Sequence, residues 1–437
     1  MRIYKLAALF FSLMLALSTV RAEEIPYSEE NFPDMTSDYV CVFDTANTQL
    51  LYEARAEEKM YPASMTKVMT AVLAIEAFPD LDQEIMIENR MWDGLIEANA
   101  SVAGFAPGET PTVRDLLYGV LLPSGADAVQ ALAIASDGSV EAFVEHMNRK
   151  AAEIGMYSTH FTNATGLHDP GHYSTARDIA LLFEYALQSE LFREIIQSRS
   201  YITPPLESHP GGLAMESTSW PLINNGEDTY DIPGFLGGKT GFTNPAGRCF
   251  VSHAEFNGMH IILVTGHSEN TGHIRDAAAV YSFYEQNYLY RTLAEKGDPV
   301  RTIPIEDSFD ADEIMIRIPE TIAMDLPGDA EIQVIPDLPE SIHAPIEAGD
   351  PLGTVTILAD DQTIRTFEIR SEISARHSRF LHVKNQMLRF YRTHTALCVT
   401  ALLVLAGLLL LLVIAGRAKK RRKAARKRKK THKKQSR

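Results

Sequence analysis

A serine and a lysine three residues apart, Ser64 and Lys67, form the pattern in this sequence with the clearest catalytic potential. A serine hydroxyl is a weak nucleophile at neutral pH and needs a neighbouring base. Positions i and i+3 of a helix lie on one face, and Pro62 suits the first turn of such a helix. A lysine whose ammonium group is buried or faces another cation can lose its proton and act as the base. Alone, the pattern recurs by chance, and its ordinary interpretation is an exposed serine and lysine on a helix surface.

Two further motifs follow along the chain. Ser124 lies in the segment LLPSGADA, residues 121–128, where a helical pattern breaks at Pro-Ser-Gly. Then Lys239, Thr240 and Gly241 enter a predicted strand after a glycine turn. An S-x-x-K, a Ser-Gly-x and a K-T-G motif would rarely occur in this order by chance, so the three together indicate nucleophilic catalysis by a serine.

With these motifs the chain resembles the serine D-alanyl-D-alanine carboxypeptidases, the low-molecular-mass penicillin-binding proteins of peptidase family S11. The resemblance covers about residues 35–380 and includes the segments YPASMTK (61–67), FTNATGL (161–167), YSTARD (173–178) and GKTGFT (238–243). It implies an α+β fold of the β-lactamase/transpeptidase type, in which helices flank a five-stranded antiparallel sheet and a helical lobe carries the second motif. In most members a small all-β domain and a C-terminal membrane anchor follow, and here we expect that anchor to be a transmembrane helix.

The resemblance also implies a catalytic role for four side chains. Ser64 would attack the carbonyl group between two D-alanines and become an acyl-enzyme. Lys67 would take the proton from Ser64, which requires a neutral amine. Ser124 and Lys239 would lower the pKa of Lys67 and relay the proton to the leaving amine. Water would then release the acyl group.

Substrate binding is expected at the K-T-G motif, where Lys239, Thr240, Gly241 and Phe242 form the substrate-binding set. Lys239 and Thr240 suit the terminal carboxylate of the peptide. The backbone amides of Ser64 and Phe242 would form the oxyanion hole, so Phe242 matters by its position rather than by its side chain. The expected reaction removes the terminal D-alanine from peptidoglycan stem peptides, needs no metal ion or cofactor, and is inhibited by penicillin and other β-lactam antibiotics.

Ala126 occupies the third position of the second motif, where this family usually has asparagine. That amide normally contacts the substrate and the first lysine, and its loss would cost on the order of 1–3 kcal/mol, about one to two decades in rate. The alternative to an active carboxypeptidase is therefore a weakly active penicillin-binding or scaffold protein of the cell wall. The adjacent Asp127 does not replace the amide, because on a helix it points elsewhere.

Two other classes of hydrolase share part of the pattern. A serine β-lactamase would need a deacylating glutamate between the second and third motifs, but Glu184 lies in an apolar helical run and is expected on the helix surface. A zinc D,D-peptidase would need clustered histidine and acidic ligands, and the segment SHPGG at 208–212 lacks the downstream ligands. His168 and His172 lie in a loop, where we expect ordinary surface residues.

The two ends of the chain predict export and membrane attachment. Residues 1–22 have a basic start, an apolar run too short to span a membrane, and a small-residue cleavage site, which is typical of a signal peptide. Residues 395–416 carry no charge and are long enough to cross a bilayer. The basic residues 417–437 could form a nucleic-acid-binding tail, but directly after a span they favour a cytoplasmic location. The protein would then be a cell-membrane protein with an extracytoplasmic catalytic domain.

A change in composition after about residue 295 divides the part of the chain that we expect to be exported into domains. We expect a peptidase domain over 23–295, a small β-rich domain over 296–375 and a juxtamembrane linker over 376–394. Within the first domain, hydrophobic patterning predicts a hairpin over 39–52, helices over 116–134, 176–187 and 276–288, and strands over 248–256 and 260–266.

The exported part is also strongly acidic. The chain has 41 Lys and Arg against 57 Asp and Glu, and 14 of the basic residues lie in the tail. We therefore expect no nucleic-acid partner for the exported part. Cys41 and Cys249 lie in apolar, strand-like segments, where either a disulfide bond or two buried thiols would fit. The sequence predicts neither an oligomeric state nor a preference between carboxypeptidase and endopeptidase activity.

Overall fold

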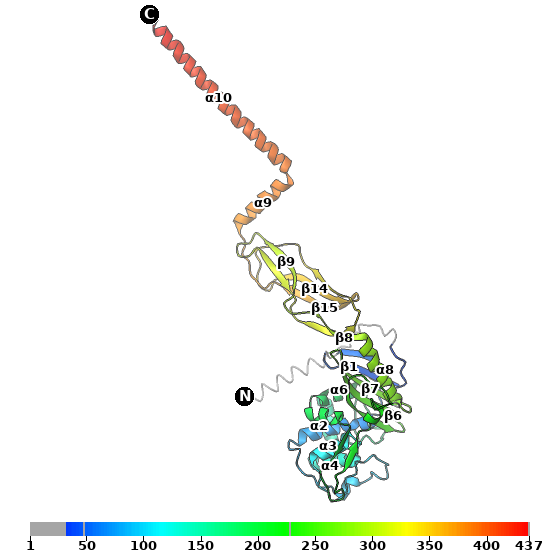
Figure 1. Ribbon diagram of the computed structural model, residues 1–437. Coiled ribbons are helices and arrows are strands. Elements are labelled where there is room, and N and C mark those ends of the chain that lie inside the picture. Colours follow the sequence, from blue (N-terminus) through cyan, green and yellow to red (C-terminus); the bar gives the residue numbers. More distant parts are fainter. Residues whose placement is uncertain (1–31, 47–48, 227–228, 436–437) are drawn as a thin grey trace. The chain divides into compact units, whose positions relative to one another are not determined.

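The structure is a computed structural model, and it describes residues 32–46, 49–226 and 229–435 (Figure 1). The predicted signal peptide at 1–22 lies outside these residues. Within them the protein contains helices and mainly antiparallel strands, which confirms the predicted α+β class.

The chain divides into two compact units. The first unit contains the chain up to Leu293 together with Ile322–Glu331. The second unit contains Ala294–Thr321 and the chain from Ile332 onward. All three sequence motifs lie in the first unit, so its architecture decides how they meet.

The core of the first unit is the predicted five-stranded antiparallel sheet. Antiparallel pairing joins the strands in the order β2 (Gln49–Ala54), β1 (Tyr39–Asp44), β7 (Met259–Ser268), β6 (Gly247–Phe256) and β5 (Phe235–Thr243). The hairpin predicted over 39–52 is present as β1–β2, and the strands predicted over 248–256 and 260–266 pair as the hairpin β6–β7. The K-T-G motif lies on β5, at one edge of the sheet.

The two faces of the sheet pack against different helices. Alternate side chains of a strand point to opposite faces. Phe250 therefore joins the buried cluster formed with α8 (Gly272–Asn287), while its neighbour Val251 joins the cluster on the other face. Figure 1 shows α8 along one side of the sheet and α6 (Ala176–Leu187) along the other.

The remaining helices of the first unit form the predicted helical lobe and its connection to the sheet. They are α3 (Val113–Leu121), α4 (Ala126–Asp137), α5 (Val140–Glu153) and α7 (Glu190–Gln197), and a small ribbon pairs β3 (Ser200–Ile202) with β4 (Ala214–Glu216). The side chains of Thr112, Ser139, Thr175 and Ser189 accept a backbone N–H bond from the third residue of the helix that each one caps. The predicted helical stretch 116–134 is indeed interrupted, between α3 and α4, at the Pro-Ser-Gly break.

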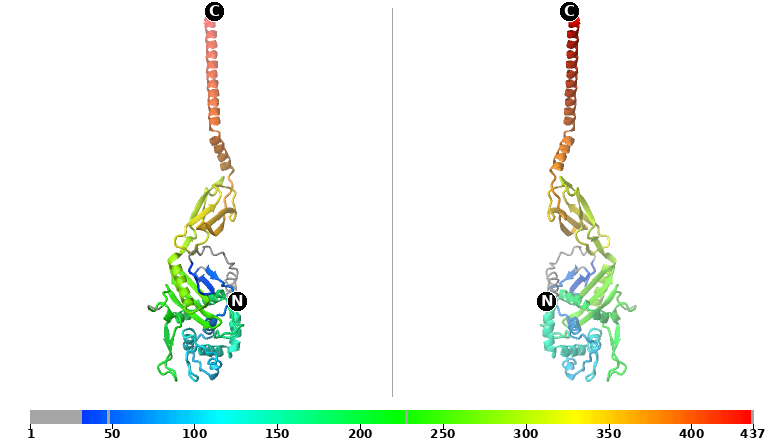
Figure 2. Two further views of the ribbon diagram at one scale, coloured as in Figure 1. Left: turned by 90° about the vertical axis from the view of Figure 1, so that its right-hand side faces the viewer. Right: turned by 90° about the vertical axis from the view of Figure 1, so that its left-hand side faces the viewer.

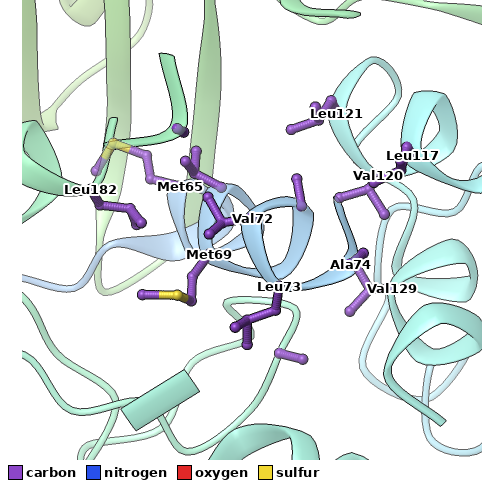
Figure 3. Packing of buried hydrophobic residues seen from close by; sticks show 14 of the residues in the cluster. Met65, Met69, Val72, Leu73, Ala74, Leu117, Val120, Leu121, Val129 and Leu182 are labelled. Atoms are coloured by element: carbon purple, nitrogen blue, oxygen red, sulfur yellow. The ribbon is translucent and has the colours of Figure 1, made fainter. Parts of the chain in front are cut away.

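Helix α2 (Lys67–Ala77) lies at the centre of this lobe and carries the first motif at its start. Figure 3 shows Met69, Val72 and Leu73 of α2 among side chains of α3, α4 and α6. Met65 precedes α2 and is also buried. Truncating a fully buried leucine such as Leu73 to alanine typically costs about 2–5 kcal/mol. The position of the first motif is therefore fixed by a packed core rather than by a surface loop.

Cys41 and Cys249 are buried free thiols, which decides between the two alternatives left open by the sequence. Cys41 lies on β1 and Cys249 on β6, and β7 runs between these strands. Neighbouring strands are about 4.8 Å apart, so the two backbones are separated by roughly 10 Å. A disulfide bond needs Cα atoms closer than about 7 Å.

The second unit contains two small sheets and two long helices. One sheet has the order β10 (Glu313–Arg317), β9 (Pro299–Glu306) and β13 (Ile342–His343), and the other has the order β12 (Ile332–Asp337), β14 (Pro351–Ala359) and β15 (Gln362–Arg370). A two-stranded ribbon of β8 (Tyr288–Ala294) and β11 (Ile322–Pro327) belongs to the first unit apart from Ala294.

Two helices end the described chain, α9 (Arg379–Thr393) and α10 (Thr395–Gln435), and α10 is drawn as one unbroken helix in Figure 2. Within the described residues, the segment Thr395–Lys423 is the one helix long and apolar enough to cross a membrane, and none of its apolar stretch is buried.

Candidate active site

Ser64 and Lys67 meet at the junction of a short 3-10 helix, Ala63–Thr66, and α2. The Lys67 ammonium Nζ donates to Ser64 Oγ over 2.9 Å and to the carbonyl oxygen of Thr165 over 2.6 Å. Ala63, directly before the serine, has a left-handed backbone with φ of 46°, which is strained for a residue with a Cβ. Strain of this kind gathers at functional sites, where the surrounding packing holds it in place.

Burial gives Lys67 the protonation behaviour of a base. Desolvation lowers the pKa of Lys67 from 10.5 to about 7, and the negative charge of Asp127 opposes this shift. A pKa near 7 leaves a large share of the amine neutral at neutral pH. The lone pair of that amine can then accept the proton of Ser64 Oγ, with which it is already in contact.

Lys239 on β5 is buried in the same region. Burial is the main reason that its pKa lies well below the ordinary lysine value, and the positive charge of Lys67 lowers it further. Its Nζ donates to the carbonyl oxygen of Thr240 over 3.0 Å. Because the two lysines repel each other, they favour a state in which at most one of them carries a proton.

Ser124 lies at the break between α3 and α4 and is buried. Its backbone is left-handed, with φ of 65°. Among the described residues its Oγ makes no hydrogen bond, although the atom is inaccessible to solvent. Leaving a buried hydroxyl without a hydrogen bond lowers the stability of the fold. Such a hydroxyl is free to exchange a proton with a bound ligand.

The K-T-G strand lies directly against the turn that carries the nucleophile. A Cβ placed on Gly241 would lie 3.0 Å from the backbone nitrogen of Ser64 and 3.1 Å from the carbonyl oxygen of Pro62. Glycine is therefore needed here to leave the Ser64 N–H accessible. The hydroxyl of Thr240 lies 2.6 Å from that of Thr218. Thr218 was not identified from the sequence, because it belongs to no motif and reaches the site only through the fold.

The side chain of Phe242 is half exposed and contacts a cation. The guanidinium of Arg248 lies 4.5 Å from the centre of the Phe242 ring, and the two residues pair across β5 and β6. A cation over an aromatic face is attracted by the ring. Arg248 was also missed by the sequence analysis, although strand pairing would have placed it opposite Phe242 once the register was known.

Ala126 begins α4 and presents only a methyl group at the position where the resemblance of the motifs leads us to expect an amide. Its N–H donates to the carbonyl oxygen of Ser101 over 2.7 Å. The side chain of Asp127 does not take the place of that amide, as expected, because it is bound to the backbone of residues 103–105. Its buried carboxylate accepts backbone N–H bonds of 2.7, 2.8 and 3.0 Å from Ala103, Gly104 and Phe105.

The loop over 161–172 packs against the turn that carries Ser64. Besides accepting from Lys67, this loop brings Gly166 so close to Ala63 that a Cβ on Gly166 would lie 1.9 Å from the Ala63 carbonyl oxygen. The Asn163 side chain accepts the N–H bonds of Thr165 and Gly166 and so fixes the loop. This packing explains the FTNATGL segment in structural terms.

His172 is not a surface residue, so that expectation was wrong. It is buried, and burial lowers its pKa to about 4. Its Nδ1 accepts the N–H of Thr162 over 3.1 Å, which leaves the proton on Nε2, 2.8 Å from the hydroxyl of Thr66. The neutral imidazole thus ties the loop to the nucleophile turn. His168 is exposed, as predicted, and meets the Tyr61 ring edge-on.

Glu184 is partly buried, so the expectation that it lies on the helix surface was also wrong. Burial raises the pKa of Glu184 to about 7, with a smaller contribution from the charge of Asp44. No hydrogen bond or ion pair of Glu184 with Ser64 or Lys67 occurs in the described structure. The geometry therefore gives no support to a deacylating glutamate at this position.

Comparison with known proteins agrees with this arrangement. The family model described as D-alanyl-D-alanine carboxypeptidase, peptidase S11, matches residues 27–269. The D-alanyl-D-alanine carboxypeptidase DacF of Bacillus subtilis is 29% identical over 343 residues, which cover 76% of this chain and 84% of DacF. DacB2 of Mycobacterium tuberculosis is 32% identical over 244 residues, 55% of this chain and 78% of DacB2.

Solved structures share the fold. Penicillin-binding protein 5 of Haemophilus influenzae has a TM-score of 0.60 and 23% identity, and the match covers 79% of this chain and 99% of that one. The carboxypeptidase DacD of Francisella tularensis has a TM-score of 0.66 and 21% identity, with 80% and 96% covered. The chain belongs to the S11 family of serine D-alanyl-D-alanine carboxypeptidases, as the resemblance of its motifs predicted.

Proposed function

We propose that this protein removes the terminal D-alanine from peptidoglycan stem peptides, with Ser64 as the nucleophile and Lys67 as its base. The contact of 2.9 Å between Lys67 Nζ and Ser64 Oγ carries this assignment. It joins a serine to a lysine whose pKa is lowered to about 7, so the base is available at neutral pH.

Each chemical step then has a candidate residue. Lys67 takes the hydroxyl proton as Ser64 Oγ bonds to the carbonyl carbon between two D-alanines. The N–H groups of Ser64 and Phe242 stabilise the negative oxygen that forms. The proton passes through Ser124 to the departing amine as the peptide bond breaks, which leaves an acyl-enzyme and free D-alanine. Lys239 and Thr240 bind the terminal carboxylate of the peptide, and Gly241 keeps the oxyanion site open.

The test of this assignment is acylation by penicillin. The full-length protein in detergent should gain the mass of one penicillin, and peptide mapping should place it on Ser64. Ser64→Ala should show no gain, whereas Ser124→Ala should be acylated at the same serine but more slowly. An unmodified Ser64 at saturating penicillin would contradict the proposal.

A weakly active penicillin-binding or scaffold role is the second candidate, because Ala126 brings no amide into the site. The two candidates separate when acylation and turnover are measured on one sample. An active carboxypeptidase releases D-alanine from a peptide ending in D-Ala-D-Ala at a rate comparable with its acylation. A scaffold protein is acylated but releases little D-alanine.

Restoring the amide gives a sharper comparison. Ala126→Asn should raise D-alanine release by about one to two decades if the missing hydrogen bonds limit catalysis. Ala126→Ser serves as a control, because it adds polarity at the same position without the reach of an amide. No change, or a loss, in Ala126→Asn means that this enzyme has adapted to alanine.

The remaining proposals concern location and organisation. We propose a signal peptide at 1–22, a peptidase domain at 23–295, a β-rich domain at 296–375, and a linker at 376–394. A span at 395–416 and a basic cytoplasmic tail at 417–437 would complete the chain. The apolar helix Thr395–Lys423 and the basic residues after it support this topology.

Protease treatment of intact spheroplasts tests the proposed topology. The catalytic domain should be digested from outside, while an epitope placed after Arg437 should survive until the membrane is opened. Survival of the catalytic domain and loss of the epitope would reverse the orientation.

A further inference from the structure

Three side chains at one end of the β6–β7 hairpin form a group with metal-ligand chemistry, separate from Ser64 and Lys67. His253 and Glu255 lie two positions apart on β6, and His260 of β7 pairs with Glu255 across the hairpin. Side chains two positions apart, and side chains of paired residues, share one face of a sheet. One nitrogen or oxygen of each residue lies within 4.8 Å of the other two.

The spacing of these atoms is that of ligands around a single small cation. Glu255 Oε1 lies 3.1 Å from His260 Nδ1 and 3.7 Å from His253 Nε2. Zinc–nitrogen and zinc–oxygen bonds of about 2.0–2.2 Å in a tetrahedron put two ligand atoms about 3.3–3.5 Å apart. The two observed distances bracket this value, and the ligand nitrogens of the two histidines lie within 4.8 Å of each other, so the three atoms can converge on one ion.

The backbone that carries the three ligands is held on both sides. Glu255 N–H donates to the Gly234 carbonyl oxygen over 3.0 Å, and a Cβ on Gly234 would lie 2.0 Å from the Glu255 carbonyl oxygen. His260 N–H donates to Asp44 Oδ1 over 2.9 Å, and Thr45 N–H donates to the His260 carbonyl oxygen over 2.9 Å. Ligands on such a fixed scaffold need little rearrangement to bind an ion.

The ligands also differ in exposure in a way that suits entry from solvent. The side chain of His253 is 6% exposed, whereas those of Glu255 and His260 are 44% and 45% exposed. The positive charge of Arg193 on α7 acts on His253. The guanidinium of Arg193 donates to the carbonyl oxygen of Leu187.

We propose that His253 Nε2, Glu255 Oε1 and His260 Nδ1 bind one zinc-class divalent cation. Two imidazoles and one carboxylate are a donor set that suits zinc, and three protein ligands leave a fourth position for water. The ion would join the ends of β6 and β7 beside their turn. Its effect is on the stability of the sheet rather than on the chemistry at Ser64.

A second group of potential ligands in the described residues, Asp307, His377 and His382, is less suited to a metal. His382 Nδ1 is already bound to Asp307 Oδ2 over 2.6 Å, and His377 is exposed. Asp307 Oδ1 also accepts from the amide of Asn385 over 2.9 Å. This group therefore serves as the competing site in the test.

Cobalt is a suitable probe, because four- or five-coordinate Co²⁺ with nitrogen and oxygen ligands absorbs visible light and zinc displaces it. The full-length protein in detergent, stripped with a chelator, should bind one equivalent of Co²⁺ with a visible spectrum. Zn²⁺ should then abolish that spectrum. In addition, Zn²⁺ should raise the midpoint of thermal unfolding of the first unit.

Variants assign the site. His260→Gln and Glu255→Gln should each weaken Co²⁺ binding by at least about tenfold. The matched control is His267→Gln on the same strand, β7. His267 is also half exposed and lies 2.6 Å from a carboxylate, that of Asp38, but it does not belong to the group of three ligands. Unfolding in the presence of chelator shows whether each variant is folded.

Two outcomes overturn the proposal. If the unaltered protein binds no Co²⁺, or if His260→Gln binds it as tightly as the unaltered protein, these three side chains do not hold the ion. If His377→Gln alone abolishes the spectrum, the ion belongs to the competing site. Retained binding in His267→Gln and His377→Gln, with loss in both His260→Gln and Glu255→Gln, supports the proposed site.

Discussion

The acylation of Ser64 should follow the deprotonation of Lys67, and pH is the perturbation that tests this. Only the neutral amine can accept the hydroxyl proton, so the acylation rate should be proportional to its neutral fraction. Burial lowers the pKa of Lys67 to about 7. The rate should therefore rise with pH and level off just above neutrality, well below the range in which an ordinary lysine titrates.

The expected magnitude follows from that pKa. With a pKa of about 7, the neutral fraction is about a tenth at pH 6, about half at pH 7 and about nine-tenths at pH 8. Acylation should thus increase about fivefold between pH 6 and 7 and less than about twofold between pH 7 and 8. An unperturbed lysine would instead give about a tenfold increase for every pH unit up to pH 9 or beyond.

The assay is the second-order rate constant for acylation by a fluorescent penicillin, measured from pH 5 to 9.5 on protein whose fold is stable over that range. Asp127→Asn tests the cause as well as the shape of the profile. The charge of Asp127 raises the pKa of Lys67, so its removal should move the profile to lower pH. A rate that still rises tenfold per unit above pH 8.5, or that does not vary from pH 5 to 9, would refute this reasoning.

Three further predictions concern the site and its support. Gly241→Ala should lower the acylation rate by about 10²–10³-fold with little change in the unfolding temperature. The added Cβ would crowd the Ser64 N–H, and loss of one oxyanion-hole donor typically lowers the rate by this factor. Stopped-flow kinetics and thermal unfolding measure the two effects. Asp127→Asn should lower the free energy of unfolding by about 1–3 kcal/mol in urea titrations, because an amide cannot accept all three N–H bonds that the carboxylate accepts; unchanged stability would contradict this. Lys67→Met should abolish acylation yet raise the free energy of unfolding by about 1–3 kcal/mol at pH 7. The gain arises because the pKa of Lys67 is lower in the folded than in the unfolded protein, and each pKa unit is about 1.4 kcal/mol. The lost hydrogen bond to Thr165 reduces this gain. This gain should shrink as pH rises toward 10.5, where the unfolded lysine also becomes neutral.

Much of the fold was predictable from the sequence because its signals are local. Short apolar runs in β6 and β7 flank an Asn-Gly turn, and both strands were predicted within a few residues. Thr175 directly precedes the predicted helix at 176–187, and its side chain accepts the N–H of Asp178 and caps α6. Here propensity, patterning and capping agree with the final packing.

The site was only partly predictable, because its chemistry depends on contacts between distant segments. The motifs identified Ser64, Lys67 and Lys239 by residue type. They could not reveal that Thr165, 98 positions away, accepts a hydrogen bond from Lys67. Nor could they show that His172, in a polar loop, is buried against Thr66. Burial is a property of the assembled core, so a loop histidine shows it only in the structure.

Of the three unpaired cysteines, the two buried in the sheet, Cys41 and Cys249, affect how the protein behaves in an oxidising environment. Burial raises the pKa of Cys41 to about 12 and that of Cys249 to about 11. Because only the thiolate reacts, both sulfurs are chemically silent in the native state and no oxidant is needed to complete the fold. The same two thiols become accessible whenever β1 or β6 leaves the sheet. On protein in which the third free cysteine, Cys398, is replaced by serine, maleimide labelling over time therefore reports the opening of this sheet.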